Sequence, residues 1–369
     1  MSKVALLHYW LTNMRGGENV FAEFCRIFPD GDIFTHAWNP DKVKEPFDSH
    51  KITETFISRL PRARKNCQIY LPLMPSALAR LDLSGYDLIL SSESGPCKGI
   101  RKPAGARHVC YCHTPMRYVW DMFDDYYRAA GIGGKIAMRL FKNYLRGYDL
   151  RSAENVDQFL ANSHFVAERI KRIYGRDSTV VHPPADTGFF VPDKDDEPKD
   201  YYLVAGQLIS YKRPELALRA CLKMHRRLVF VGDGSMRKRL EKEADGNPDI
   251  VFAGRVSRPQ LRKYYAEAKG LIFPGIEDFG IVPLESQSVG VPVIALGIGG
   301  ALETVVSRQT GVFFPEPEVD SLCRAIEEFE ALRFSRPDII RHARNFSREV
   351  FVRKMKQVLG IAEPEKPES

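Results

Sequence analysis

Residues 271–289 read LIFPGIEDFGIVPLESQSV and contain one complete strand-to-helix junction. The apolar run 271–274 is typical of a buried strand, and a helix is expected to begin near Pro283. Two glycines in the intervening loop allow the backbone to turn tightly. The junction therefore predicts a βα unit, in which a crossover helix leads from one parallel strand to the next.

The same alternation of short apolar runs and helix-like segments continues on both sides of this junction. After position 200, the expected strands are 201–205, 228–231, 250–253, 271–274, 291–295 and 311–314, and the expected helices are 213–224, 236–244, 259–268, 284–289 and 320–332. Before position 200, the expected strands are 4–10, 86–91, 106–112, 157–161 and 179–182, and the expected helices are 18–27 and 165–174. Ser163 and Ser257 are expected to cap the helices that follow them. This pattern predicts an α/β protein whose parallel sheets are covered by helices on both faces.

The length of 369 residues suggests two domains, at about 150 residues for each domain. Polar, proline-containing sequence separates two sets of βα units, so we expect one domain at 1–165 and a second at 166–345. Residues 346–369 are expected to form a C-terminal helix that packs back on the first domain and ends in a frayed tail. Apolar residues make up 44% and charged residues 27%, which excludes a disordered, collagenous or coiled-coil chain.

The charge and the cysteines limit the choice of partner and compartment. Lysine and arginine exceed aspartate and glutamate by only 7, which is too small a bias to indicate nucleic acid binding. The seven scattered cysteines favour a reducing cytoplasm over a disulfide framework. The N-terminal apolar run is expected to be a strand and not a signal peptide, and no apolar stretch approaches the roughly 18 to 20 residues of a membrane-spanning helix. Any contact with a membrane is therefore expected to be peripheral.

Two carboxylates flank the junction quoted above, Glu277 in the loop and Glu285 in the first turn of the helix. The backbone N–H groups of the loop and the positive end of the helix favour an anion such as phosphate. Carboxylates repel phosphate but accept hydrogen bonds from hydroxyls beside it, as a sugar offers. The alternative is that Glu285 only complements the helix dipole and Glu277 is a solvated loop residue.

Two other strand ends in the second half carry candidate ligand-binding residues. Lys212 and Arg213 follow the strand 201–205 and could neutralise a diphosphate, or they could be a solvated pair at a helix start. The pair of glycines at 232 and 234 resembles half of a dinucleotide-binding fingerprint. Its third glycine is absent because Arg237 occupies that position, so a tight turn without a ligand is an equal alternative.

In the first half, Gly16 and Gly17 follow the first strand and allow the backbone to approach a ligand, or form an ordinary βα turn. His113 lies at the carboxyl tip of the strand 106–112, where a ligand cleft is expected in a parallel sheet. A zinc site made by His113 with Cys110 and Cys112 lacks a fourth ligand and the usual spacing. The triplet 30–32, Asp-Gly-Asp, is interpreted as a turn on the far side of the sheet.

Taken together, these segments resemble retaining glycosyltransferase family 4, and most closely its bacterial O-antigen and exopolysaccharide mannosyltransferases. The segments that carry the resemblance are 91–92, 109–121, 277–285 and 299–305. The resemblance covers nearly the whole chain. It implies the GT-B fold, in which two Rossmann-like domains with doubly wound parallel sheets face each other across a cleft.

The resemblance also implies roles for individual residues. His113 would lie beside the donor sugar, Lys212 would stabilise the departing diphosphate, and Glu277 would bind sugar hydroxyls, so these three are the implied catalytic residues. The residues implied to bind the nucleotide sugar are Gly16, Gly17, Gln207, Lys212, Arg213, Glu277, Asp278, Phe279, Gly280, Ile281, Val282 and Glu285. Glu285 would hold the ribose. Gln207 departs from the family pattern, which usually has an arginine near this position, and Arg213 could substitute for that arginine.

The implied reaction is transfer of a hexose, with mannose from GDP-mannose expected, onto a lipid-linked oligosaccharide at the cytoplasmic face of the membrane. It would proceed with retention, without a metal and without a cofactor other than the nucleotide-sugar substrate. Segments 62–74 and 135–146 mix cations with apolar residues, so each is either a contact for anionic membrane or an ordinary core-facing element.

Three other functions compete with this interpretation. A sugar-nucleotide epimerase would use the same fold without an acceptor, and a non-catalytic carbohydrate-binding subunit is favoured by Gln207. A dinucleotide-dependent oxidoreductase is disfavoured because no candidate strand is followed by the full glycine fingerprint.

Overall fold

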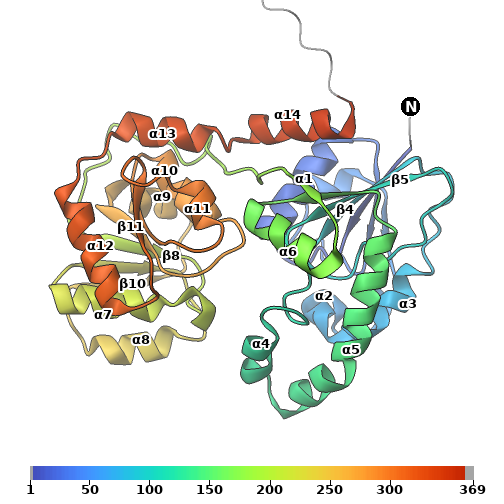
Figure 1. Ribbon diagram of the computed structural model, residues 1–369, viewed down its shortest axis with the longest axis horizontal. Helices are drawn as coiled ribbons and strands as arrows, with labels where there is room; N and C mark the ends of the chain where they lie inside the picture. The colour runs from blue at the N-terminus through green and yellow to red at the C-terminus, as the bar shows by residue number, and fades with distance from the viewer. Residues whose placement is uncertain (1–2, 362–369) are drawn as a thin grey trace, which may run out of the picture. The chain divides into compact units, whose positions relative to one another are not determined.

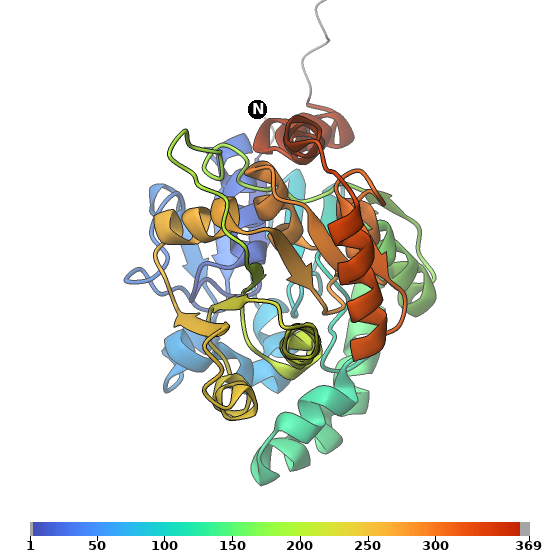
Figure 2. The ribbon, with the colours of Figure 1, turned by 90° about the vertical axis from the view of Figure 1, so that its left-hand side faces the viewer.

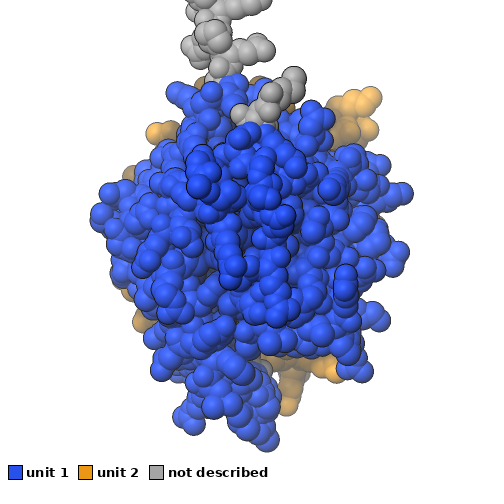
Figure 3. Space-filling view, turned by 90° about the vertical axis from the view of Figure 1, so that its right-hand side faces the viewer, with its two compact units in different colours: residues 1–182, 354–369 blue, residues 183–353 orange. Residues whose placement is uncertain are grey.

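The computed structural model describes residues 3–361 and divides the chain into two compact units. The first unit ends at His182 and resumes at Lys354, and the second unit runs from Pro183 to Arg353 (Figure 3). The boundary expected after residue 165 therefore falls inside the first unit. The reason is that residues 178–180 pair with β6 as a further strand of the first sheet, whereas the sequence pattern had assigned them to the second domain.

The first unit contains a seven-stranded parallel sheet in the order β3-β2-β1-β4-β5-β6-β7 (Figure 1). Its strands are β1 (Val4–His8), β2 (Asp32–Thr35), β3 (Ile52–Glu54), β4 (Leu88–Glu93), β5 (Arg107–Cys112), β6 (Gln158–Ala161) and β7 (Ser178–Val180). Its α-helices are α1 (Gly16–Ile27), α2 (Ala63–Asn66), α3 (Met74–Leu78), α4 (Phe123–Ala129), α5 (Ile132–Glu154) and α6 (His164–Tyr174). Its 3₁₀ helices are η1 (Phe47–Ser49), η2 (Phe56–Arg59) and η3 (Cys67–Leu73).

The second unit contains a six-stranded parallel sheet in the order β10-β9-β8-β11-β12-β13, with helices on both of its faces (Figure 2). Its strands are β8 (Tyr202–Ala205), β9 (Leu228–Val231), β10 (Ile250–Gly254), β11 (Gly270–Phe273), β12 (Val293–Leu296) and β13 (Gly311–Phe314). Its helices are η4 (Ser210–Lys212), α7 (Pro214–Met224), α8 (Arg237–Ala244), α9 (Arg258–Glu267), α10 (Ile281–Ser288), α11 (Ala301–Thr304), α12 (Val319–Ala331) and α13 (Arg336–Arg344). The predicted α/β class with two doubly wound parallel sheets is confirmed.

The strand order reverses once in each sheet, between β1 and β4 in the first and between β8 and β11 in the second. At such a point the two following connections leave toward opposite faces of the sheet, so a crevice opens at the carboxyl ends of the two strands. The loops after these four strands are therefore the places where each unit is built to hold a ligand.

Local sequence explains why the elements begin where they do. The Ser163 side chain accepts a hydrogen bond from the backbone N–H of Val166, and Ser257 and Gln260 form a reciprocal capping box at α9. Both predicted caps are confirmed. Within the described residues, no helix combines the length and apolar composition needed to cross a membrane.

The last helix, α14 (Arg348–Leu359), returns the chain to the first unit. The Arg107 guanidinium on β5 donates hydrogen bonds to the backbone carbonyls of Val358, at 3.2 Å, and Leu359, at 3.1 Å. The tail expected at 364–369 lies outside the described residues.

Candidate active site

An ion pair occupies the reversal point of the second sheet. Lys212 ends the loop after β8, Glu277 lies in the loop after β11, and the Lys212 Nζ atom is 2.7 Å from the Glu277 Oε1 atom. Both side chains are about one-fifth exposed, at 20% and 21%. The structure thus brings together a cation and a carboxylate that lie 65 positions apart in the sequence, and both face solvent in part.

Backbone packs directly on backbone around this ion pair. The Gly300 N–H donates to the Glu277 carbonyl at 2.9 Å, and a Cβ atom on Gly300 would lie only 2.2 Å from the Cα atom of Phe279. Gly232, after β9, has a φ angle of +130°, and a Cβ atom there would lie 1.9 Å from the Gly206 carbonyl oxygen. These loops hold their shape only with glycine at both positions.

The loop after β11 ends in the open first turn of α10. This helix begins at Ile281, two residues before the predicted start, because Gly280 adopts a φ angle of +101° as its N-cap. Gly280 has no side chain with which to cap this turn, and the N-terminus of a helix favours an anion. The segment from Asp278 to Val282, implied by the sequence to bind the donor, lies at this helix end.

Glu285, in the second turn of α10, is partly buried. Burial raises the pKa of its carboxyl to about 7, and a hydrogen bond donated by the Tyr265 hydroxyl at 2.9 Å opposes that rise. Because its pKa is near neutral pH, this carboxyl can gain or lose a proton when a bound ligand changes its surroundings.

Gln207 and Arg213 occupy the two ends of the loop that contains Lys212. Gln207 is exposed, and Arg213 is the N-cap of α7 with a left-handed φ angle of +51°. Residues 206–208 contain no arginine, so the cations in this loop are Lys212 and Arg213.

The reversal point of the first sheet holds a chain of polar side chains. His8 ends β1 and pairs in register with Ser92 of β4. The His8 Nδ1 atom lies 3.1 Å from the Ser92 Oγ atom, which lies 2.8 Å from the Nε2 atom of His113 after β5. Three neighbouring strands therefore contribute one side chain each to a continuous hydrogen-bonded chain.

The start of α1 packs closely on this chain. A Cβ atom on Gly17 would lie 2.8 Å from the Tyr9 hydroxyl and 3.6 Å from His113 Nε2. Glu18 accepts a hydrogen bond from the Arg15 N–H, and its other carboxylate oxygen lies 3.8 Å from His8 Nε2. Gly17 thus allows the helix to approach Tyr9 and His113, and the approach of Gly16 and Gly17 to a ligand stays a prediction.

His113 is neutral in this setting. Burial, with smaller contributions from the neighbouring His8 and Arg117 side chains, lowers its pKa to about 3. The ring of His113 contacts the ring of Tyr111, with centroids 5.1 Å apart.

Cys110 and Cys112 lie in a different environment from His113. They belong to a hydrophobic cluster with residues of β6 and α6, where burial raises the pKa of both thiols. All seven cysteines are buried and unpaired. Asp32, from the Asp-Gly-Asp triplet, begins β2 at the amino end of the sheet and accepts a hydrogen bond from the Tyr86 hydroxyl.

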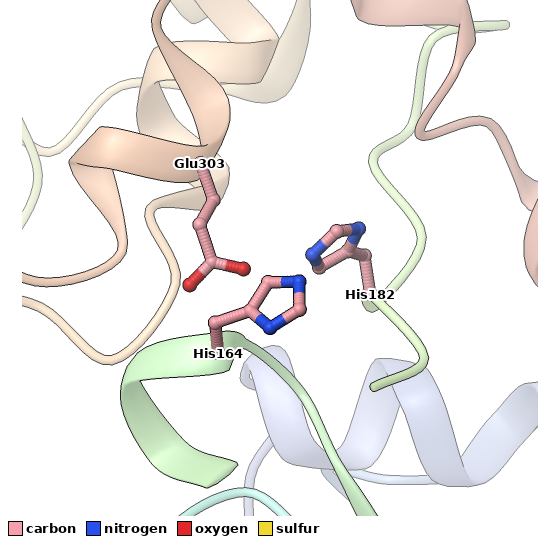
Figure 4. Close-up of side chains that lie close together, drawn as sticks. All are labelled: His164, His182 and Glu303. Carbon is pink, nitrogen blue, oxygen red and sulfur yellow. The ribbon is translucent and has the colours of Figure 1, made fainter. Parts of the chain in front are cut away.

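Sequence patterning singled out His113 but missed His8 and Glu18, which contact its surroundings. Their positions in the sequence could have identified them, because His8 is the last residue of the first strand and Glu18 directly follows the glycine pair. Two more histidines follow neighbouring strands of the same sheet, His164 after β6 and His182 after β7. Their ring centroids are 6.2 Å apart (Figure 4); Glu303 in that figure lies on α11 of the second unit.

Two family models match the chain along nearly its whole length. Residues 14–189 match the model described as Glycosyltransferase Family 4, and residues 187–346 match the model described as Glycosyl transferases group 1. The chain is a glycosyltransferase.

Curated relatives of this glycosyltransferase include two mannosyltransferases. The mouse alpha-1,3/1,6-mannosyltransferase ALG2 is 27% identical over 301 residues, which cover 70% of this chain and 69% of the mouse protein. The GDP-mannose-dependent alpha-(1-6)-phosphatidylinositol monomannoside mannosyltransferase of Mycolicibacterium smegmatis is 26% identical, over 49% of this chain and 55% of that protein. The matches to several other curated relatives likewise span about half of their length.

Solved structures with the same arrangement of elements include a sucrose-phosphate synthase and a galactosyltransferase. The sucrose-phosphate synthase of Thermosynechococcus elongatus has a TM-score of 0.73 at 20% identity, with 98% of each chain covered. The lipopolysaccharide outer core galactosyltransferase WaaB has a TM-score of 0.69 at 16% identity, with 97% of this glycosyltransferase and 99% of WaaB covered. At these identities the likeness shows the fold, which is GT-B with two Rossmann-like units.

Proposed function

We propose that this glycosyltransferase moves mannose from GDP-mannose to a hydroxyl of a lipid-linked oligosaccharide, with retention at the anomeric carbon. The observation that carries the proposal is the Lys212–Glu277 ion pair beside the open end of α10. A cation and an uncapped helix end suit a diphosphate, and a carboxylate beside them suits the hydroxyls of an attached sugar. The two mannosyltransferase relatives support mannose as the sugar.

In this proposal Lys212 and Arg213 neutralise the charge that develops on the departing diphosphate, without a metal or other cofactor. Glu277 accepts hydrogen bonds from the sugar hydroxyls, and the backbone of 278–282 holds the diphosphate. Glu285 accepts hydrogen bonds from the ribose hydroxyls. His113 and the backbone of Gly16 and Gly17 complete the surroundings of the donor. The acceptor hydroxyl attacks on the face that the diphosphate leaves, so the enzyme contributes positioning and charge stabilisation.

The donor is tested by thermal unfolding with GDP, UDP, ADP, dTDP and NAD. A ligand at about 100 times its dissociation constant adds about 2.7 kcal/mol of stability. We expect GDP to give the largest shift, and Glu285→Ala to reduce that shift. A shift with UDP alone would contradict GDP-mannose as the donor but leave the diphosphate site intact. No shift with any diphosphate would contradict the site itself.

Transfer and stereochemistry are tested with radiolabelled GDP-mannose and lipid extracts. We expect label in the lipid fraction only when acceptor is present, and an α-linkage in the product. Conversion of the donor without acceptor would indicate an epimerase instead.

We further propose that the protein works in the cytoplasm, in cell-surface polysaccharide synthesis such as that of lipopolysaccharide, and that α5 contacts anionic membrane. Four apolar side chains on α5 follow one another at intervals of four residues and are 46% to 83% exposed: Ile132, Ile136, Leu140 and Tyr144. Four cations alternate with them, and the segment 132–148 contains no carboxylate: Lys135, Arg139, Lys142 and Arg146. Helix α4 and the N-terminal part of α5 extend away from the sheet of the first unit (Figure 1), whereas the C-terminal part of α5 contains the buried residues Leu145 and Ala153.

Aromatic rings hold these cations in place. Lys142 lies over the ring of Phe123 at 3.7 Å, and Lys135 and Arg139 both lie over the ring of Tyr127. A second copy of the chain is a poor partner for this face, because a two-fold contact would bring the cations of the two copies together. An anionic lipid surface satisfies both the charges and the apolar stripe.

The alternative segment 62–74 is anchored to the core by three buried residues. Its Cys67 and Met74 are buried in a cluster that also contains Ala63, and Leu71 packs against that cluster. Ile69 and Leu73 remain exposed, but without the regular stripe of α5.

Flotation with vesicles of neutral and anionic lipid tests the α5 face. Since each basic residue near an anionic surface contributes about 1 kcal/mol, the double variant Lys135→Ala, Arg139→Ala should bind about 30-fold more weakly. Ile69→Asn, which removes an exposed apolar residue from the other segment, should bind as the native protein does. Binding that ignores lipid charge and salt would contradict the proposal, as would a dimer that forms without lipid and is lost in Leu140→Asn.

A further inference from the structure

The hydrogen-bonded chain His8–Ser92–His113 has to arrange its protons in one of a few ways. The Ser92 hydroxyl carries a single proton and lies between two imidazole nitrogens, at 3.1 Å and 2.8 Å. It can donate to only one of them and accepts a hydrogen bond from the other. For two neutral rings, the protonated nitrogen of His8 therefore determines the protonated nitrogen of His113.

Glu18 faces the remaining nitrogen of His8. Its Oε1 atom lies 3.8 Å from His8 Nε2, both side chains are almost completely buried, and His8 Nε2 has no hydrogen-bond partner within residues 3–361. A carboxylate attracts an N–H group and repels a lone pair at the same position. The buried negative charge therefore favours the proton on His8 Nε2, which leaves His8 Nδ1 as an acceptor for the Ser92 hydroxyl.

We propose that Glu18, His8 and Ser92 are positioning residues that hold His113 with a proton on Nε2 and a bare Nδ1. The His113 Nε2–H donates to Ser92 Oγ, and Nδ1 is left as a hydrogen-bond acceptor. An acceptor at this point suits a hydroxyl of a sugar and disfavours a phosphate oxygen, which requires a donor. The identity of the hydroxyl as one of the donor sugar rests on the proposed function; the protonation of His113 does not.

Two observations support this assignment. The low pKa of His113 keeps its ring neutral throughout the physiological range, so only one of its two nitrogens carries a proton. Strand register also fixes the hydrogen-bonded chain of side chains. His8 pairs with Ser92 across β1 and β4, and Ser92 pairs with Tyr111 across β4 and β5. Strand pairing places His8 and Ser92, and the His113 N–H donates to the Glu93 carbonyl at 2.8 Å, which continues the pairing one residue beyond β5.

The direct test is long-range proton–nitrogen NMR on the full-length protein labelled with ¹⁵N-histidine, with the rings assigned from His8→Phe and His113→Phe. We expect a proton on Nε2 and none on Nδ1 in both rings. A proton on Nδ1 of His113, or two protons on His8, would overturn the proposal. The measurement needs no substrate, so it stands even if GDP-mannose proves not to be the donor.

The neighbouring residue Ser91 supplies a matched control. Its hydroxyl lies 2.9 Å from His108 Nε2, it is as completely buried as Ser92, and it projects from the opposite face of β4. We expect Ser92→Ala to lower kcat/KM for transfer about tenfold, the effect of about one net hydrogen bond, and Ser91→Ala to leave it unchanged. Equal losses in both variants would indicate a structural role alone.

Glu18→Gln tests the source of the bias. Glutamine can still accept the Arg15 N–H in the capping box, but its amide can face either tautomer of His8. We expect both tautomers of His113 to appear in the NMR spectrum, with the melting temperature close to that of the native protein. A single unchanged tautomer would show that Glu18 does not set it.

Discussion

At the scale of single residues, Lys212 is the group whose charge has the clearest chemical use. Its Nζ atom is 2.7 Å from Glu277 and partly exposed, so it can exchange that partner for a diphosphate. We expect Lys212→Ala to lower kcat about 100-fold, comparable with removing one donor from a site of developing negative charge, with a smaller change in KM. The control is Lys223→Ala, which removes an exposed lysine from the same unit. An unchanged kcat would exclude the assigned role.

Glu285 makes the stability of the fold depend on pH. Its pKa is raised to about 7 in the folded protein, from about 4.3 in an unfolded chain, so below pH 4 both states are protonated and the difference vanishes. As pH rises from about 4 to 7 the unfolded state loses its proton first, and the free energy of unfolding therefore falls. Glu285→Gln should be more stable than the native protein at pH 8 and equal to it at pH 4. Denaturant titrations at several pH values measure this, with the exposed Glu327→Gln as control.

The sequence predicted the residues of the second unit's site better than those of the first. Lys212, Glu277 and Glu285 each follow a clear strand-to-helix junction, and each junction is local in the chain. His8, Ser92 and Glu18 meet His113 only through the pairing of β1, β4 and β5, which are separated by long stretches of sequence. A pattern within one segment does not predict which residues of distant strands pair. The hydrogen-bonded chain of polar side chains could therefore be found only from the structure.

At the scale of elements, the loop after β9 depends on glycine at 232. An alanine Cβ there would lie 1.9 Å from the Gly206 carbonyl oxygen, and the φ angle of +130° disfavours any other residue. We expect Gly232→Ala to lower the free energy of unfolding by about 3 kcal/mol, from backbone strain together with a main-chain collision. Gly246→Ala, at φ +69° with open space around it, should cost only about 1 kcal/mol. Similar costs for the two variants in denaturant titrations would contradict the packing argument.

The sequence pattern identified the elements whose apolar residues repeat at a regular interval or whose helix start has a clear capping residue. Helix α6 was expected at 165–174 and runs over His164–Tyr174, because its apolar face and its serine cap are both local signals. The short strand β3 was not anticipated, since three residues are too few to establish alternation, and β2 was implied only by the turn expected at 30–32. Helix α5 was recognised only over 135–146, because its exposed apolar stripe does not follow the usual division into buried and polar faces.

At the scale of the whole molecule, the sequence predicted two parallel-sheet units joined by a polar, proline-containing stretch that begins near residue 165. The two compact units divide at residue 182, because β7 completes the first sheet against β6. The order of the strands in each sheet could likewise not be predicted from the sequence pattern, because it depends on which strands pair and not on where they begin. The reversal points between β1 and β4 and between β8 and β11 are what place both groups of polar residues.

The return of the chain to its first unit rests on a small number of polar contacts that can be removed singly. The Arg107 guanidinium bonds to Gln158 Oε1 at 2.6 Å and to the carbonyls of Val358 and Leu359, and so links β5, β6 and the last turn of α14. We expect Arg107→Ala to speed amide hydrogen exchange over 356–360 about tenfold, because these carbonyls lose a charged donor while the rest of the unit keeps its core. Lys356→Ala, which removes an exposed side chain from the same turn, should leave exchange unchanged. If Arg107→Ala also leaves it unchanged, the buried side chains Met355 and Leu359 hold the helix end without the arginine.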